Sequence, residues 1–191
     1  MAAGGSTRIG SPKQLLKWKD SNLLEHTISK AIQLKVSEII VVLGANSEEI
    51  ISQLDQNKIR ILVNHDWELG LGSSISEGVK FIQKSYPDIS AVLIMLSDQP
   101  LIEQEHFIKM IRLFEHNTKK IIVTEYDDEK QGVPALFDNF YFKDLCELNA
   151  DYGAKHLFKK YSKDIHEIVN KNASFDIDTL EQYEKLYLAN H

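Results

Sequence analysis

Residues 1–13 read Met-Ala-Ala-Gly-Gly-Ser-Thr-Arg-Ile-Gly-Ser-Pro-Lys, a stretch of small residues that also contains two cations. Glycines let the backbone approach an anion closely, so that successive N–H groups converge on its oxygens. Arg8 offers a planar fork for phosphate oxygens, and Lys13 offers a compact positive charge. Pro12 restricts the backbone beside Lys13. The stretch predicts a loop that binds a nucleoside triphosphate, and an ordinary glycine-rich turn with two surface cations is the alternative.

This loop differs from two common phosphate-binding motifs. A Walker loop has Lys and then Ser or Thr directly after its last Gly, whereas Gly10 is followed by Ser11 and Pro12. The dinucleotide fingerprint G-x-G-x-x-G is absent as well. The pattern Ala-Ala-Gly-Gly-Ser-x-Arg-x-Gly-x-Pro-Lys resembles the signature of nucleotidyltransferases with a MobA-like fold, and among them the MocA-like molybdenum cofactor cytidylyltransferases. The resemblance implies that the nucleotide contacts Ala2, Ala3, Gly4, Gly5, Ser6, Arg8 and Lys13.

Length, charge and cysteine content narrow the class of protein. A chain of 191 residues is long enough for one domain with a sizeable core, and we expect a single domain over residues 1–191. The net charge of −6 argues against a nucleic-acid binder that depends on broad phosphate neutralisation. No apolar run approaches the length of a membrane span. Cys146 is the single cysteine, which excludes an internal disulfide and favours a reducing, cytoplasmic environment.

Short apolar runs alternate with amphipathic segments, which is typical of a layered α/β domain. We therefore expect a three-layer α/β/α, Rossmann-like fold with a mostly parallel sheet. The expected strands are residues 37–43, 59–63, 91–96 and 121–124. Four expected helices begin at possible capping boxes: Asn22/Glu25, Asn46/Glu49, Ser74/Glu77 and Thr179/Gln182. Three further helices are expected over residues 103–115, 139–148 and 153–161.

The family that the loop resembles has a buried strand of five or six residues leading into this loop. Here the loop itself starts at Met1, so we expect the first strand to be truncated or vestigial. A missing central strand leaves hydrogen-bonding edges exposed and weakens the anchor of the loop.

A second candidate segment, residues 64–78, lies between an expected strand and an expected helix. Glycines and serines at a helix N-terminus present N–H groups and hydroxyls to polar ligand edges. The family resemblance implies that four residues of this segment line a pocket for the nucleotide base: Gly70, Gly72, Ser73 and Ser74. The alternative is a plain helix cap, and for Trp67 and Asn64 a structural role is the favoured interpretation.

Two acidic segments are candidate metal ligands. Asp98, in Ser-Asp-Gln-Pro, directly follows an expected buried strand and thus lies at the carboxyl edge of the sheet. A carboxylate there suits Mg²⁺, which favours carboxylates together with substrate phosphates. In Asp176-Ile-Asp178, the resemblance implies that Asp178 is the second Mg²⁺ ligand and that Asp176 is a weaker candidate for substrate binding. A turn-forming Asp98 and a solvated or structural Asp176 remain the alternatives.

Two further segments resemble parts of the family's sequence, and the resemblance places the first of them beside the acceptor. Gly132 and Pro134 lie in a Gly-x-Pro segment, and residues 149–155 are similar to a Gly-Asp-x-Gly-Ala stretch. By composition alone, either segment is equally well a turn.

The resemblance implies a Mg²⁺-dependent enzyme that moves CMP from CTP to the terminal phosphate of molybdopterin and releases pyrophosphate. Its catalytic residues would be Lys13, Arg8 and Asp98, and a molybdenum hydroxylase would be a possible partner. Three alternatives remain open. The same fold serves another nucleotide, or a sugar or polyol phosphate acceptor; the protein is a non-catalytic carrier of nucleotide or cofactor; or it is a glycosyltransferase.

Overall fold

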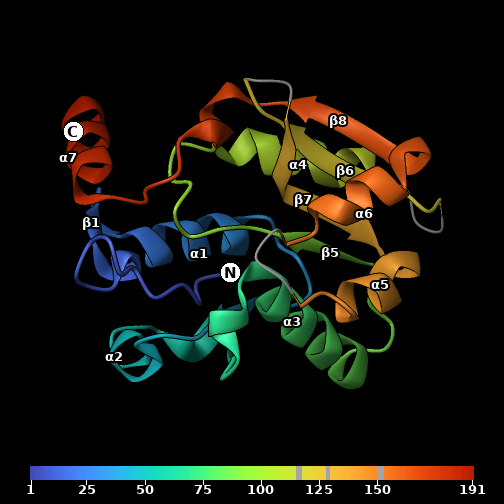
Figure 1. Ribbon diagram of the computed structural model, residues 1–191, viewed down its shortest axis with the longest axis horizontal. Coiled ribbons are helices and arrows are strands. Elements are labelled where there is room, and N and C mark those ends of the chain that lie inside the picture. The colour runs from blue at the N-terminus through green and yellow to red at the C-terminus, as the bar shows by residue number, and fades with distance from the viewer. Residues whose placement is uncertain (115–117, 128–129, 150–152) are drawn as a thin grey trace.

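The central strands of the protein lie between layers of helices (Figure 1). The computed structural model describes residues 1–114, 118–127, 130–149 and 153–191. The strands are β1 (Lys17–Trp18), β2 (Ser21–Asn22), β3 (Ile40–Leu43), β4 (Arg60–Val63), β5 (Ala91–Ile94), β6 (Ile121–Glu125), β7 (Gln131–Asp138) and β8 (Ile165–Val169). The α-helices are α1 (Leu23–Gln33), α2 (Ser47–Ile51), α3 (Leu71–Ser85), α4 (Gln104–Leu113), α5 (Phe142–Cys146), α6 (Lys155–Lys160) and α7 (Leu180–Asn190).

The strands form the expected parallel pairs of a Rossmann-like α/β fold, and also antiparallel pairs that make the sheet mixed. β3 pairs with β4 in parallel, and β6 pairs with β8 in parallel. β7 lies between β5 and β6 and runs antiparallel to both, in the order β5-β7-β6-β8. The reason is that residues 131–138, which the sequence suggested as an acceptor-side segment or a turn, form a long strand buried on both faces.

Side chains on the two faces of the sheet belong to different clusters, which confirms the three-layer α/β/α architecture. Val92 and Ile94 of β5 pack in the cluster that includes α3, α5 and α6. Leu93, between them, points to the other face, where Phe107 and Met110 of α4 pack. This alternation follows from the two-residue period of a strand.

Residues 1–3 lie between β3 and the segment that follows β5. The N–H of Ala2 donates to Val42 O at 2.9 Å, and the N–H of Ser97 donates to Met1 O at 3.2 Å. The amino group of Met1 donates to Met95 O at 2.7 Å. Beside this short segment, an apolar cavity of about 190 Å³ separates β3 from β5, with α1 and α3 among the elements that line it. These residues therefore hydrogen-bond both to β3 and to the segment that follows β5.

Of the four possible capping boxes, only the one at α7 forms in full, and at α1 the first residue caps the helix without completing its box. Asn22 caps α1 by accepting from the N–H of Glu25, and Thr179 forms a complete box with Gln182 at α7. Asn46 adopts a left-handed conformation and makes no cap, and α3 begins at Leu71, three residues before the predicted cap Ser74. No helix in the described ranges is both long and apolar enough to cross a membrane.

The buried His106 of α4 makes the stability of the fold depend on pH. Its Nε2 lies 2.8 Å from Thr124 Oγ1, whose hydroxyl donates to Pro134 O. Burial, and then the charge of Lys109, lower the pKa of His106 to about 4 from its ordinary 6.5. The unfolded chain thus binds the proton more tightly, and this contribution to stability is lost as the pH falls from about 6.5 through about 4.

We expect the free energy of unfolding to decrease on acidification by up to roughly 3 kcal/mol from this group alone. Urea denaturation at pH 7 and at pH 4.5 measures this difference in the free energy of unfolding. His106→Gln should flatten the dependence, whereas the same change at the exposed His65 should leave it intact. Equal pH dependence in wild type and His106→Gln would contradict the expectation.

Candidate active site

A cleft of about 570 Å³ lies at the carboxyl ends of β3 and β5, the edge where open α/β sheets bind ligands. It brings together four of the predicted segments, which are far apart in the sequence. Its walls are residues 1–8 with Lys13 and Gln14; Trp67, Glu68, Gly70, Leu71 and Ser74; residues 96–98; and Asp178.

The glycine-rich turn presents free backbone donors to this cleft. The N–H groups of residues 4–8 have no acceptor within the described parts of the protein. The turn keeps its shape because Ser6 Oγ accepts from the N–H of Lys13 at 3.0 Å. The buried Gln14 donates from Nε2 to Ala2 O at 2.8 Å and to Gly4 O at 3.1 Å. A run of free N–H groups on a fixed turn is a site for an anion.

Trp67 packs directly against this turn, which agrees with the structural role favoured for it. A Cβ at Gly44 would lie 2.4 Å from Trp67 Cβ and 2.6 Å from Ala3 O. A Cβ at Gly5 would lie 2.9 Å from the same indole. Both positions therefore need glycine for the indole ring to hold the turn at this distance.

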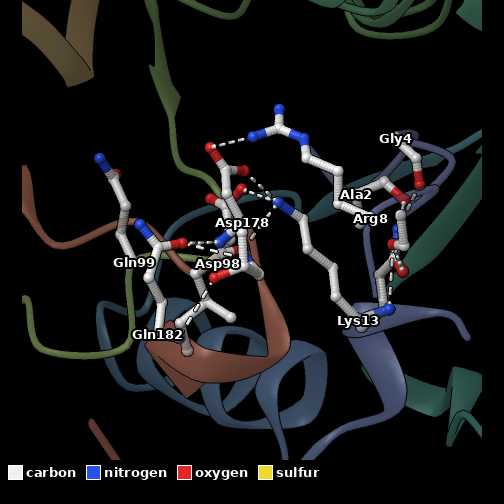
Figure 2. Close-up of polar contacts among 12 residues, drawn as sticks. Ala2, Gly4, Arg8, Lys13, Asp98, Gln99, Asp178 and Gln182 are labelled. Atoms are coloured by element: carbon white, nitrogen blue, oxygen red, sulfur yellow. Dashed lines mark hydrogen bonds and ion pairs between the residues drawn. The ribbon is translucent and has the colours of Figure 1, made fainter. Parts of the chain in front are cut away.

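Lys13 contacts both predicted metal ligands (Figure 2). Its Nζ donates to Asp98 Oδ2 at 2.6 Å and to Asp178 Oδ1 at 3.2 Å, and it also donates to Ile177 O at 3.0 Å. Burial lowers the pKa of Lys13, but the charge of Asp98 and then that of Asp178 outweigh it. The pKa therefore lies above its ordinary value, and the ammonium is charged at neutral pH.

Arg8 reaches the carboxylate of Asp178 (Figure 2). Its guanidinium lies 3.8 Å from Asp178 Oδ2, and the side chain is 69% exposed. Such an exposed pair contributes little to stability. Arg8 is accordingly available to an incoming anion.

The carboxylates of Asp98 and Asp178 also fit a divalent cation. Because both approach one Nζ, their oxygens are within reach of a single ion. The buried Oδ1 of Asp98 has no hydrogen-bond partner among the described residues. Those residues contain no cluster of three or more His, Cys, Asp or Glu side chains suited to a metal. A pair of carboxylates suits Mg²⁺ nevertheless, because this ion takes its other ligands from water and phosphate oxygens.

A family model for the MobA-like NTP transferase domain matches residues 1–165, most of the chain and the whole of the turn. The chain belongs to this family. It is therefore a nucleotidyltransferase, as the signature of its first thirteen residues indicated.

Known relatives of this MobA-like protein differ in their activities. Nicotine blue oxidoreductase of Paenarthrobacter nicotinovorans is 26% identical over 97% of this chain and 93% of the relative. A probable molybdenum cofactor guanylyltransferase of Bacillus mycoides is 28% identical over 73% of this chain and 66% of the relative. The structure of Rv0371C from Mycobacterium tuberculosis H37Rv, solved in complex with manganese, superposes with a TM-score of 0.80 at 24% identity, over 98% of this chain and 95% of that one.

Only part of the predicted base pocket lines the cleft of the MobA-like fold. Gly70 and Ser74 do, whereas Gly72 and Ser73 are not among the lining residues. Ser73 Oγ instead donates to Asp66 O at 2.8 Å and accepts from Asn64 Nδ2 at 2.7 Å. Because the helix begins at Leu71, this hydroxyl is used inside the protein, and its role in the base pocket stays a prediction.

The predicted acceptor residues lie outside the cleft. Gly132 and Pro134 belong to β7, where Pro134 O accepts from a threonine hydroxyl of β6. Asp176 lies close to Gln99 and Asp98; burial, and then the charge of Asp98, raise its pKa to about 6. Asp176 is thus a neighbour of the site, and acceptor binding by these three residues stays a prediction. Of the segment 149–155, residues 150–152 lie outside the described residues.

Three residues that support the site were not predicted: Gln14, Lys30 and Gln99. Gln14 fixes the turn, and Lys30 and Gln99 hold the loop that carries Asp98. A polar residue in the otherwise apolar run Gln14-Leu15-Leu16 was a usable signal for the first. The other two donate to backbone carbonyls distant in the sequence, so no local pattern marks them.

Proposed function

We propose that this MobA-like nucleotidyltransferase moves CMP from CTP to the terminal phosphate of a molybdopterin-type acceptor and releases pyrophosphate. The observation that supports it best is the arrangement of Lys13. Its ammonium stands between a turn with free N–H groups and two carboxylates that suit a metal–triphosphate.

In the proposed reaction, an acceptor phosphate oxygen forms a bond to the α-phosphorus of CTP, and the bond from that phosphorus to the β-phosphate oxygen breaks. The acceptor is already anionic at neutral pH, so the site needs charge neutralisation and alignment more than a general base. The free N–H groups of the turn and Arg8 hold the departing pyrophosphate. Lys13 neutralises the growing charge on the α-phosphate.

Asp98 and Asp178 are the residues that would hold Mg²⁺, which when bound withdraws charge from the triphosphate. Both carboxylates also pair with the Lys13 ammonium. The two carboxylates therefore have two tasks: they orient the Lys13 ammonium, and they provide anionic oxygens for the metal.

The choice of CTP and molybdopterin rests on the similarity of this chain to known nucleotidyltransferases. Residues 2–6 resemble the cytidylyl branch, and the Bacillus mycoides relative is a probable molybdenum cofactor guanylyltransferase. A molybdenum hydroxylase would then receive the product. Another nucleotide, another phosphate acceptor and a non-catalytic carrier are the alternatives.

CTP with Mg²⁺ is expected to raise the melting temperature more than GTP, UTP or ATP. At a free concentration of 100 times its Kd, a ligand adds about 2.7 kcal/mol to the free energy of unfolding. For a chain of this size, that raises the melting temperature by roughly 5–10 °C. Differential scanning fluorimetry with the four triphosphates measures the shift. A pyrophosphate assay with CTP and molybdopterin then tests turnover.

A larger shift with GTP would move the proposal to guanylyl transfer. Binding of CTP without any pyrophosphate release would favour the carrier. If no triphosphate binds, the proposal fails, and assays for oxidoreductase activity, as in the Paenarthrobacter relative, become the next step.

A further inference from the structure

The loop of residues 97–102, which carries Asp98, is tied to several separate parts of the protein. Besides the bond from Ser97 to Met1, Asp98 O accepts from the N–H of Ile177 at 3.0 Å, which links the loop to the segment before Asp178. Gln99 Nε2 donates to Ala173 O at 3.0 Å and to Val133 O at 3.3 Å. A further tie comes from α1, through Lys30.

Lys30 holds the far end of this loop. Its Nζ donates to Pro100 O at 2.8 Å and to Ile102 O at 2.6 Å. In return, Gln104 Nε2 donates to Lys30 O at 3.2 Å. Two carbonyls on one side of a tight loop need donors, and Pro100 has no N–H of its own to contribute to the turn. The ammonium satisfies both.

This use of a lysine is energetically unusual. Among the described residues, no carboxylate lies within ion-pair distance of Nζ, and the side chain is partly buried. Burial lowers the pKa of Lys30 to about 8, although the charge of Glu103 raises it. The group is still charged at neutral pH, and hydrogen bonds from a charged donor are stronger than those from a neutral one.

We propose that Lys30 is a positioning residue for Asp98: it fixes the loop so that the Asp98 carboxylate meets Lys13 and the metal at the right place. The path is short, since Pro100 is two residues from Asp98 and Lys13 is bonded to that carboxylate. Loss of the ammonium would free the carbonyls of Pro100 and Ile102 and let the loop move. Displacements of about 1 Å at a phosphoryl-transfer centre lower rates by up to a hundredfold.

The inference rests on the proposed function, because the role of Asp98 does. It is tested with Lys30→Met, which keeps the length of the side chain and removes the donors. A second variant, Lys30→Gln, keeps two N–H donors on a shorter side chain and serves if Lys30→Met does not fold. Lys30→Arg tests rescue. The matched control is Lys80→Met, at an exposed lysine of α3 that pairs with Glu77 on the same helix.

In the pyrophosphate assay, Lys30→Met should lower kcat about tenfold to a hundredfold, with KM for CTP changed by less than about threefold. Lys30→Arg should recover most of kcat, because it keeps the charge and the donors. Hydrogen exchange of the free protein, measured by mass spectrometry, should become faster at residues 97–102 in Lys30→Met. Lys80→Met should match wild type in both measurements.

A folded Lys30→Met protein with wild-type kcat, or with unchanged exchange at residues 97–102, overturns the proposal. A parallel loss of stability and activity in all three variants, with no rescue by arginine, also overturns it, since that is the pattern of a merely structural residue. If wild type releases no pyrophosphate from any triphosphate, the proposed function fails, and the exchange measurement still decides the role of Lys30.

Discussion

Lys13→Ala is expected to lower kcat by two to three orders of magnitude, the loss that removal of one charge-stabilising donor typically causes, about 3–4 kcal/mol. Lys13 is the cation at the centre of the cleft, 2.6 Å from Asp98 and 3.2 Å from Asp178. Without it, the two carboxylates face each other with no ammonium between them. Steady-state release of pyrophosphate from CTP measures the effect.

Lys17→Ala is the control for this experiment. Lys17 lies four residues further on, is exposed in β1, and uses its carbonyl rather than its side chain, accepting from the Tyr183 hydroxyl. Its removal should leave kcat unchanged. Circular dichroism should show both variants folded, and a kcat within a few-fold of wild type in folded Lys13→Ala would refute the role of Lys13.

Asp98→Asn should cause a loss of similar size, two to three orders of magnitude in kcat, for a different reason. The amide keeps the volume of the side chain and removes its negative charge. Lys13 then loses its nearest anionic partner, and the metal loses a ligand. We expect a higher Mg²⁺ concentration for half-maximal activity as well, measured by titrating Mg²⁺ in the same assay.

The control for Asp98→Asn is Asp88→Asn, because Asp88 is an exposed residue of the loop between α3 and β5. This variant should retain the activity and the Mg²⁺ response of wild type. An unchanged Mg²⁺ titration in Asp98→Asn would remove Asp98 from the proposed metal site, even if its kcat were reduced.

The sequence predicted the layers of the fold better than the direction of its strands. Apolar runs such as residues 91–94 are readable because a strand covered on both faces is apolar throughout. The antiparallel β7 was not predicted, because Gly132 and Pro134 in its first half are typical of turns, whereas its pairing with both β5 and β6 depends on contacts distant in the sequence. The same holds for β8, whose alternation of exposed and half-buried residues is weak.

The site was predictable where chemistry is carried by short motifs. The turn and the Asp-Gln-Pro segment are local patterns, and the structure brings Lys13, Asp98 and Asp178 together. For Ser73 the sequence leaves two uses open, because a serine near a helix start is equally suited to a ligand or to a buried amide such as that of Asn64. Only the actual first residue of α3 distinguishes the two, and helix boundaries are weakly determined by sequence.

The turn and Asp98 belong to different halves of the strand arrangement. The turn extends from residues that pair with β3, whereas Asp98 lies in the segment that follows β5, and both line the cleft. A triphosphate in contact with the turn and with Asp98 would connect the two halves through its own phosphate chain. The substrate would then act as a structural brace, and the resistance of the protein to proteolysis would rise and fall with the amount of nucleotide around it.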